Sequence, residues 1–178
     1  KKYAKDNFPD AKENLFACFI ERCCLLAKDV GQSALVTMHN WMFLSSFQKM
    51  REHLLRAKTI RTMAHLGAGA FGRISGEVVQ ASTFVLRNIR PRGYRPVFFR
   101  LVDGGEERKR TALRLGENRF ADAAQSEFEK IPGSPVAYWV SANVRESFVA
   151  FPAASSSVDP REGLATGNND RYVRCWPE

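Results

Sequence analysis

Arginines alternate with aromatic residues in the segment 87–100. The set comprises Arg87, Arg90, Arg92, Arg95 and Arg100, with Tyr94, Phe98 and Phe99 between them. Guanidinium groups bind phosphates and aromatic rings stack on bases, so this pattern is typical of a nucleic-acid contact. A solvated edge strand whose arginines prevent aggregation explains the same residues equally well. Both interpretations stay open at the level of sequence.

The overall charge favours an anionic partner. The 178 residues include 27 Lys and Arg against 19 Asp and Glu, which gives a formal net charge of +8. Such a balance is compatible with nucleic-acid binding and also with a protein that is merely basic.

The residue types give little support for nucleophilic catalysis or for a nucleotide-binding loop. The three histidines, His39, His53 and His65, fit no Ser-His-Asp or Cys-His order, and His53 is expected to face solvent from a helix. The glycines of the segment 67–72 are followed by a strand rather than a helix, which argues against a nucleotide-binding loop.

Metal binding and a membrane location are not expected. Cys18, Cys23, Cys24 and Cys175 form no C-x-x-C pair, and Cys23 and Cys24 fall on an apolar helix face, as buried and reduced thiols do. No apolar run approaches the roughly 18 residues of a membrane span. We therefore expect a soluble protein of the reducing cytoplasm, without a metal.

The first half of the chain reads as a strand–helix unit. Apolar residues at three-to-four spacing predict a helix that starts at Pro9-Asp10 and ends near Gly31. The segment 33–38 is predicted to be a buried strand, and Ser45 or Ser46 to cap the helix that follows. Such a parallel strand delivers residues to the rim of an α/β sheet, where function collects.

Three further strands are predicted, at 59–66, 77–88 and 97–102. A loop of small residues, 67–76, separates the first two of these, and Phe71 is its only large aromatic residue. From composition alone, Phe71 either folds back onto the core or is presented by the loop, and core packing is the simpler explanation.

The second half of the chain is less regular. A charged helix is expected at 106–114, with a solvated face, and a strand at 136–140, whereas 144–151 fits either type of element. Small residues at 152–160 indicate a linker. The chain ends look cut, so we expect a fragment divided into 1–103, a connecting segment at 104–160, and the start of another region at 161–178.

Several segments together resemble adenine-specific DNA methyltransferases. They are residues 14–22, 35–44, 65–71 and 76–79, in the same order and spacing as in the back half of such an enzyme. The resemblance is closest to the PglX-type methyltransferases of BREX phage-defence systems, which have short sequence motifs similar to residues 41–47 and 168–172. It spans most of the chain and is weakest at 108–151.

This resemblance implies an α/β fold, the C-terminal part of a Rossmann-like class I methyltransferase sheet, followed by the start of a target-recognition region. It implies methyl transfer from S-adenosylmethionine to the N6 of adenine in double-stranded DNA, for which the base is rotated out of the helix. In the family, an aromatic residue in the loop before an antiparallel edge strand stacks on that base. Phe71 has this position, so the resemblance favours stacking over core packing.

The resemblance also assigns roles to other residues. Leu15 and Phe19 match a helix that closes part of the cofactor pocket, although core packing explains their spacing as well. Asn40 and Trp41 match the turn at the rim of the substrate cleft, where Trp41 is alternatively a buried anchor.

Four arginines are predicted to contact the DNA backbone; they are Arg73, Arg90, Arg92 and Arg95.

The family's Asn-Pro-Pro-Tyr motif and its acidic-glycine cofactor motif do not occur in this sequence. Catalytic residues are therefore expected upstream of Lys1, and the chain alone is expected to be inactive. The leading hypothesis is a partial BREX-type adenine methyltransferase, for which other BREX subunits are expected partners. The alternatives are a non-enzymatic basic nucleic-acid-binding module and an interaction unit of a defence complex.

Overall fold

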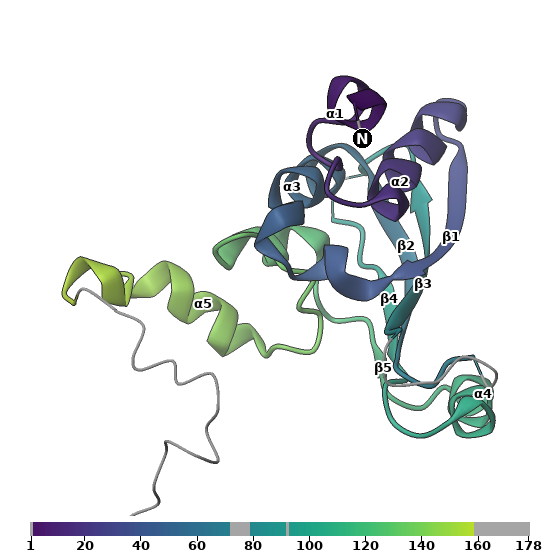
Figure 1. The fold of residues 1–178 in the computed structure, drawn as a ribbon. Helices are drawn as coiled ribbons and strands as arrows, with labels where there is room; N and C mark the ends of the chain where they lie inside the picture. Colours follow the sequence, from purple (N-terminus) through teal and green to yellow (C-terminus); the bar gives the residue numbers. More distant parts are fainter. Residues whose placement is uncertain (1, 72–78, 92, 159–178) are drawn as a thin grey trace, which may run out of the picture.

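The computed structural model describes residues 2–71, 79–91 and 93–158 (Figure 1). The helices in these ranges are α1 (Lys2–Asn7), α2 (Leu15–Leu26), α3 (Gln48–Ala57), α4 (Glu106–Leu115) and α5 (Ala142–Ala150). The strands are β1 (Gln32–Met38), β2 (Thr59–Gly67), β3 (Ala81–Arg87), β4 (Val97–Arg100) and β5 (Arg119–Phe120).

The strands form one mixed sheet in the order β1-β3-β2-β4-β5. β3 is antiparallel to both β1 and β2, so these two strands run parallel with β3 between them. β4 is parallel to β2, and the short β5 is antiparallel to β4. The α/β class is thereby confirmed. β3 is antiparallel, as the resemblance implies for the strand after Phe71, but it lies inside the sheet and not at an edge.

β1 forms an edge of the sheet in the described part of the chain, and its prediction as a buried strand was wrong. Its residues alternate between exposed and half-buried, and Val36 is 59% exposed. The apolar run 34–36 reads as buried in sequence, yet no described element covers the second face of β1. Alternation of this kind is what a strand with one covered face shows.

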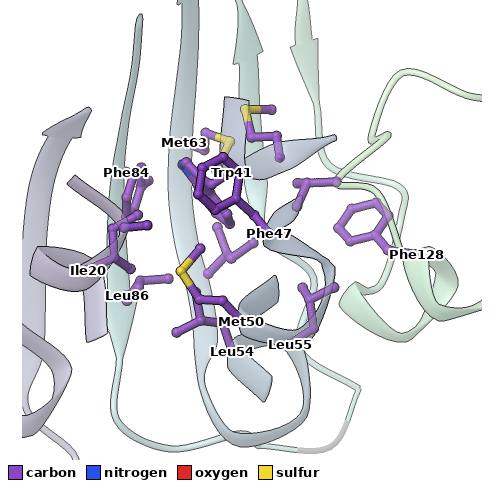
Figure 2. Packing of buried hydrophobic residues seen from close by; sticks show 14 of the residues in the cluster. Ile20, Trp41, Phe47, Met50, Leu54, Leu55, Met63, Phe84, Leu86 and Phe128 are labelled. Carbon is purple, nitrogen blue, oxygen red and sulfur yellow. The ribbon is translucent and has the colours of Figure 1, made fainter. Parts of the chain in front are cut away.

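The main core lies between the sheet and the helices α1, α2 and α3, which share one face (Figure 1). Trp41, Met63 and Phe84 fill its centre, and Met50 and Leu54 reach it from α3 (Figure 2). A smaller cluster of Ala64, Leu101 and Ala112 forms under α4. Most of the apolar burial therefore supports β2, the central strand of the sheet, and its neighbour β3.

The helices predicted in the first half of the chain are present, but the residues that begin them differ from the predicted ones. α2 begins after Asn14, whose side-chain oxygen accepts a hydrogen bond from the Phe16 amide, and not at Pro9-Asp10. Ser45 and Ser46 belong to a 3-10 turn that leads into α3, and no side-chain cap bond is formed there. β1, α3 and β2 form the expected strand–helix–strand unit.

α4 confirms the predicted charged helix, but one of its charges is buried. The Lys109 ammonium donates hydrogen bonds of 2.7 Å to the carbonyl oxygens of Leu66 and Leu101, at the ends of β2 and β4. Arg110 forms the expected surface pairs with Glu106 and Glu107. Lys109 thus ties α4 to the carboxyl end of the sheet.

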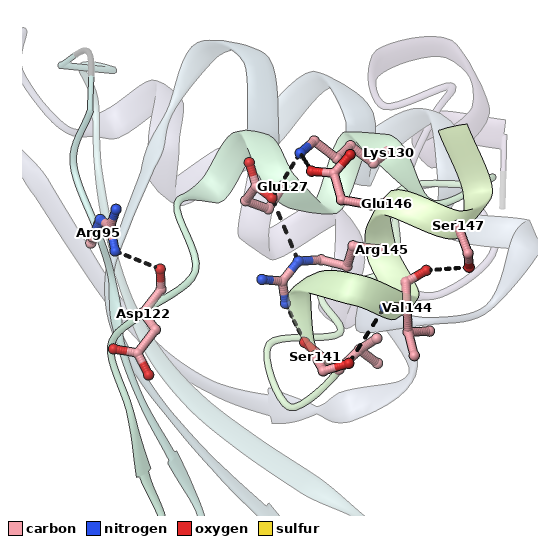
Figure 3. A network of polar contacts seen from close by, with 10 residues as sticks. Arg95, Asp122, Glu127, Lys130, Ser141, Val144, Arg145, Glu146 and Ser147 are labelled. Carbon is pink, nitrogen blue, oxygen red and sulfur yellow. Dashed lines mark hydrogen bonds and ion pairs between the residues drawn. The ribbon is translucent and has the colours of Figure 1, made fainter. Parts of the chain in front are cut away.

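The segment 136–140 is not a strand, contrary to the prediction. Val136 donates its amide to the Met42 carbonyl at 2.9 Å, and the chain then turns at Tyr138 and Trp139. The ambiguous segment that follows is the helix α5, which Ser141 caps. Arg145 of this helix contacts the Val140 carbonyl and Glu127 (Figure 3).

A buried arginine connects three parts of the fold. Arg51 of α3 is 1% exposed, and its guanidinium donates to the carbonyl oxygens of Trp41 (2.8 Å), Leu44 (2.9 Å), Gly133 and Ser134 (3.0 Å). Burial lowers the pKa of Arg51 from its ordinary value. Because an arginine has five N–H donors and no acceptor, a set of four carbonyl acceptors suits it well.

Replacing Arg51 by Met should destabilise the fold strongly. The substitution keeps an apolar stem but leaves the carbonyl groups of Trp41, Gly133 and Ser134 without a donor, whereas the Leu44 carbonyl keeps the Phe47 amide. This loss should cost about 3 kcal/mol or more of unfolding free energy. Arg56→Met, on an exposed position of the same helix, is the matched control and should cost less than about 0.5 kcal/mol. Urea unfolding measures both; equal effects would show that the Arg51 contacts are dispensable.

Candidate active-site rim

The carboxyl ends of β1 and β2 lie on the same side of the sheet, because the two strands are parallel. The turn 39–43 leaves β1 there, and the loop with Phe71 leaves β2. In open α/β sheets, ligands bind outside the carboxyl ends of the parallel strands. The candidate site is therefore this rim.

Two histidines meet at the rim. The Nδ1 atom of His39, directly after β1, lies 2.7 Å from the Nε2 atom of His65, near the end of β2. The second nitrogen of His65, Nδ1, lies 3.3 Å from the hydroxyl of Tyr138. The three side chains form a hydrogen-bonded chain that links β1, β2 and the turn before α5.

Aromatic rings surround this chain. The Phe43 ring lies 5.3 Å from His39 and 5.7 Å from Trp139, centroid to centroid, both edge to face. The Tyr138 ring stacks on Phe98 of β4 at 4.6 Å with an interplanar angle of 1°. Such packing fixes the rings, and it leaves Trp139 39% exposed at the surface.

The environment keeps both imidazoles neutral. Burial lowers the pKa of His65 to about 4, and the charges of Arg100 and Lys109, together with that of His39 when it is protonated, add to this effect. Burial also lowers the pKa of His39 and raises that of Tyr138. At neutral pH the chain therefore carries no charge, and each of its members is a hydrogen-bonding group.

Phe71 is exposed to 41%, so it does not fold back onto the core as composition alone suggested. The loop reaches it through Gly67 (φ +61°) and Gly69 (φ +67°), backbone conformations that favour glycine. At Gly67, an added Cβ would lie only 3.1 Å from the Cβ of Val102, so a side chain would also crowd that residue.

Asn40 and Trp41 lie in the turn after β1, as predicted. Trp41 is fully buried against Phe84, 4.9 Å between ring centroids, so it anchors the turn by burial. Asn40 is half-buried, and its carbonyl accepts the amides of Phe43 and Leu44. Of the two, only Asn40 has side-chain surface at the rim.

Leu15 and Phe19 are 68% and 60% exposed, so core packing does not explain their spacing. They line an apolar pocket of about 240 Å³ between α1 and α2, together with Tyr3, Phe8 and Cys18. The buried face of α2 is formed by other residues, namely Ala17, Cys18, Ile20 and Cys24.

Two of the four arginines predicted to bind the DNA backbone, Arg90 and Arg95, fall within the described residues, and neither lies at the rim. Arg90 pairs with Glu129 at 2.8 Å and, with Arg56 and Tyr94, lines a pocket of about 410 Å³ at the amino end of β2. Arg95 donates to the Asp122 carbonyl (Figure 3).

The nine residues of β2, at about 3.3 Å each, separate this end from the rim by roughly 30 Å. Arg73 and Arg92 lie outside the described residues, as does the segment 161–178.

The hydrogen bond between His39 and His65 was not predicted from the sequence, where the two histidines were considered only as members of a catalytic triad. The available signal was their position, since each stands at the carboxyl end of a predicted strand. Tyr138 carried no such signal, because it was assigned to a strand. His53 is exposed, as expected.

Comparisons with known proteins agree with the resemblance. The family described as Eco57I restriction-modification methylase matches residues 1–71. The chain is 48% identical over 179 residues to the adenine-specific methyltransferase BrxX of Escherichia coli O9:H4 (strain HS), which covers 100% of this chain. It is 40% identical over 184 residues, 99% of this chain, to the adenine-specific methyltransferase PglX of Lacticaseibacillus casei (strain Zhang).

The chain spans about 15% of the length of each of these relatives. It is therefore homologous to a segment of the adenine-specific methyltransferases, and the resemblance read from the sequence is confirmed. Within the ranges that the structure describes, no helix has the length and hydropathy for a membrane crossing. The same ranges contain no group of three His, Cys, Asp or Glu side chains that could hold a metal.

The depressed pKa of His65 predicts acid sensitivity of the fold. An unfolded histidine takes up a proton near pH 6.5, whereas the folded one stays neutral to about pH 4. Stability is therefore complete above pH 6.5 and falls as the pH drops towards 4, by at most about 3 kcal/mol from this residue. His65→Phe should flatten the pH dependence of urea unfolding in this window.

The exposed His53 provides the control for this measurement. His53→Gln should keep the wild-type pH dependence. A wild-type stability that is constant between pH 7 and pH 4.5 would contradict the neutral, buried state of His65.

Proposed function

We propose that this chain forms part of a DNA adenine N6-methyltransferase of the BREX type that acts on double-stranded DNA in the cytoplasm. The identity of 48% along the whole chain to an adenine-specific methyltransferase carries the proposal. The same proposal makes β1, β2 and β3 the last strands of a Rossmann-like class I sheet. A further strand would pair with the open edge of β1, and the target-recognition region would begin near residue 161.

S-adenosylmethionine would supply the methyl group. The exposed apolar side chains of Leu15 and Phe19 fit a role in covering an apolar part of this cofactor. The carboxyl end of α2 contacts the start of β1, where the Ser33 hydroxyl donates to the Cys23 carbonyl, and at its amino end Phe16 packs against Phe47, which follows the turn after β1. No Asn-Pro-Pro-Tyr motif occurs in the chain, so the groups that hold the adenine amine would come from elsewhere in the enzyme.

Phe71 is proposed to stack on the adenine after it leaves the duplex. Its exposure, its place after β2 and its presentation by a glycine-rich loop support this role. Stacking orients the base without reading its edge, which lets other groups hold the amine for methyl transfer.

Loss of the Phe71 ring should slow methylation. In the full-length polypeptide that contains this chain, Phe71→Ala should lower kcat/KM for duplex DNA roughly tenfold to a hundredfold, because one stacked base contributes about 1–3 kcal/mol. Phe71→Trp should retain most activity. Transfer of a labelled methyl group from S-adenosylmethionine measures both variants.

Leu26→Ala is the control, since Leu26 is also an exposed apolar residue (68%, against 41% for Phe71) but stands at the far end of α2. Wild-type activity of Phe71→Ala would refute the stacking role. An inactive wild-type enzyme would refute the proposed function itself.

A second candidate function is phosphate binding by the basic pocket at the amino end of β2. Arg56 and Arg90 line it beside Tyr94; Arg56 is exposed and Arg90 is partly buried. This pocket favours a backbone contact at a distance from the rim, which a basic binding module without enzymatic activity would also use.

The salt dependence of DNA binding tests this contact. If Arg90 binds a phosphate, Arg90→Ala should weaken binding to all sequences and reduce the slope of log K against log salt by about 1. Arg114→Ala removes the same charge from the end of α4 and should leave the slope unchanged. An unchanged slope in Arg90→Ala would exclude the contact.

A further inference from the structure

The hydrogen-bonded chain at the rim leaves one imidazole nitrogen available. His65 uses both of its nitrogens, Nε2 towards His39 and Nδ1 towards Tyr138. His39 uses only Nδ1, and its Nε2 has no partner within the described part of the chain. His39 is half-buried, so this atom belongs to a side chain with access to the surface.

The Tyr138 hydroxyl determines which nitrogens carry protons. A phenol is a better donor than acceptor towards a neutral imidazole, so Tyr138 donates to His65 Nδ1. His65 then carries its proton on Nε2 and donates it to His39 Nδ1. The remaining proton of His39 must be on Nε2, which makes that atom a neutral hydrogen-bond donor on a half-buried side chain at the rim.

The surroundings of His39 suit a flat aromatic ligand. Phe43 packs edge to face against His39, and the half-exposed Trp139 packs against the other side chain of this pair, Phe43. Ser82 of β3 stands opposite His65 in the ladder, fully buried, and its hydroxyl lacks a hydrogen-bond partner among the residues described. Polar and aromatic groups therefore gather at the carboxyl ends of β1 and β2, and the loop that presents Phe71 leaves the same end of β2.

We propose that His39 donates a hydrogen bond from Nε2 to a ring nitrogen of the adenine that is rotated into the rim, and that His65 and Tyr138 are positioning residues that fix the orientation of its imidazole. The proposal rests on the proposed function, because it assigns a further base contact to the same site. It goes beyond stacking by Phe71, since a donor at this place would read the edge of the base.

The two roles have different consequences for specificity. An aromatic face accepts every base, whereas a neutral donor requires an acceptor nitrogen at one position of the ring. Adenine offers N1, N3 and N7 as acceptors, while the N1 of guanine carries a proton. A fixed donor to N1 would thus select adenine over guanine without touching the amine, whereas a donor to N3 or N7, which guanine also offers, would only orient the base.

The experiment combines protein variants with base analogues in the full-length polypeptide. The target adenine of a duplex is replaced in turn by 1-deaza-, 3-deaza- and 7-deazaadenine, each of which lacks one ring nitrogen. Wild-type enzyme should lose roughly 5–50-fold in kcat/KM with one of the three, as expected for one hydrogen bond to a ring nitrogen. His39→Phe should lose a similar factor with natural adenine.

Assaying the His39 variants on the sensitive analogue shows whether both changes remove the same hydrogen bond. His39→Phe on the sensitive analogue should show little loss beyond either change alone, because both changes remove the same hydrogen bond. His39→Gln, which places an amide N–H near the position of Nε2, should recover part of the activity. Tyr138→Phe should give a smaller loss on adenine that also disappears on the sensitive analogue.

Thermal unfolding of each variant identifies losses that come from the fold alone. Should His39→Phe fail to fold, His39→Gln and Tyr138→Phe carry the same test. Multiplicative losses for every pair of variant and analogue would overturn the proposal and leave His39 with a structural role. A wild-type enzyme that does not methylate adenine would instead overturn the proposed function.

Discussion

The buried guanidinium of Arg51 is the interaction on which the arrangement of the rim depends. It binds the carbonyl oxygens of Trp41 and Leu44 on one side and those of Gly133 and Ser134 on the other. These carbonyls belong to the turn after β1 and to the segment before Tyr138. A charge taken out of water is costly unless polar groups surround it, and the carbonyl dipoles compensate for that cost only while both segments stay in place. Arg51 thereby holds the His39 turn and the Tyr138 turn at a fixed separation.

The sheet supplies the second constraint. Because β3 runs antiparallel between β1 and β2, the two parallel strands end on the same side, about two strand spacings apart. The His39–His65 contact bridges that distance above β3. The arrangement explains why a loop from β2 and a turn from β1, far apart in sequence, contribute to one rim.

The sequence predicted well those elements whose signals are local. α2, α3, α4 and β2 follow from apolar spacing and β-branched residues, and their bounds agree to within a few residues except for α2, which starts later than Pro9-Asp10 and ends at Leu26, before the predicted end near Gly31. The segment 136–140 was mistaken for a strand because Val136, Ala137 and Tyr138 are buried for another reason, namely contact with the turn after β1. The position of β3 between its neighbours depends on long-range pairing, which periodicity does not encode.

The same distinction applies to the site. The family resemblance identified Phe71, whose exposure agrees with its expected role, and also Trp41, which is buried. The His39–His65–Tyr138 chain depends on residues up to 99 positions apart and has no motif, so only the folded arrangement reveals it. The central claim is that this chain serves adenine methylation. Nucleoside mass analysis of duplex DNA, after incubation with the full-length protein and S-adenosylmethionine, tests it most directly: N6-methyladenine is the predicted product, whereas methylated cytosine or unmodified DNA would contradict the account.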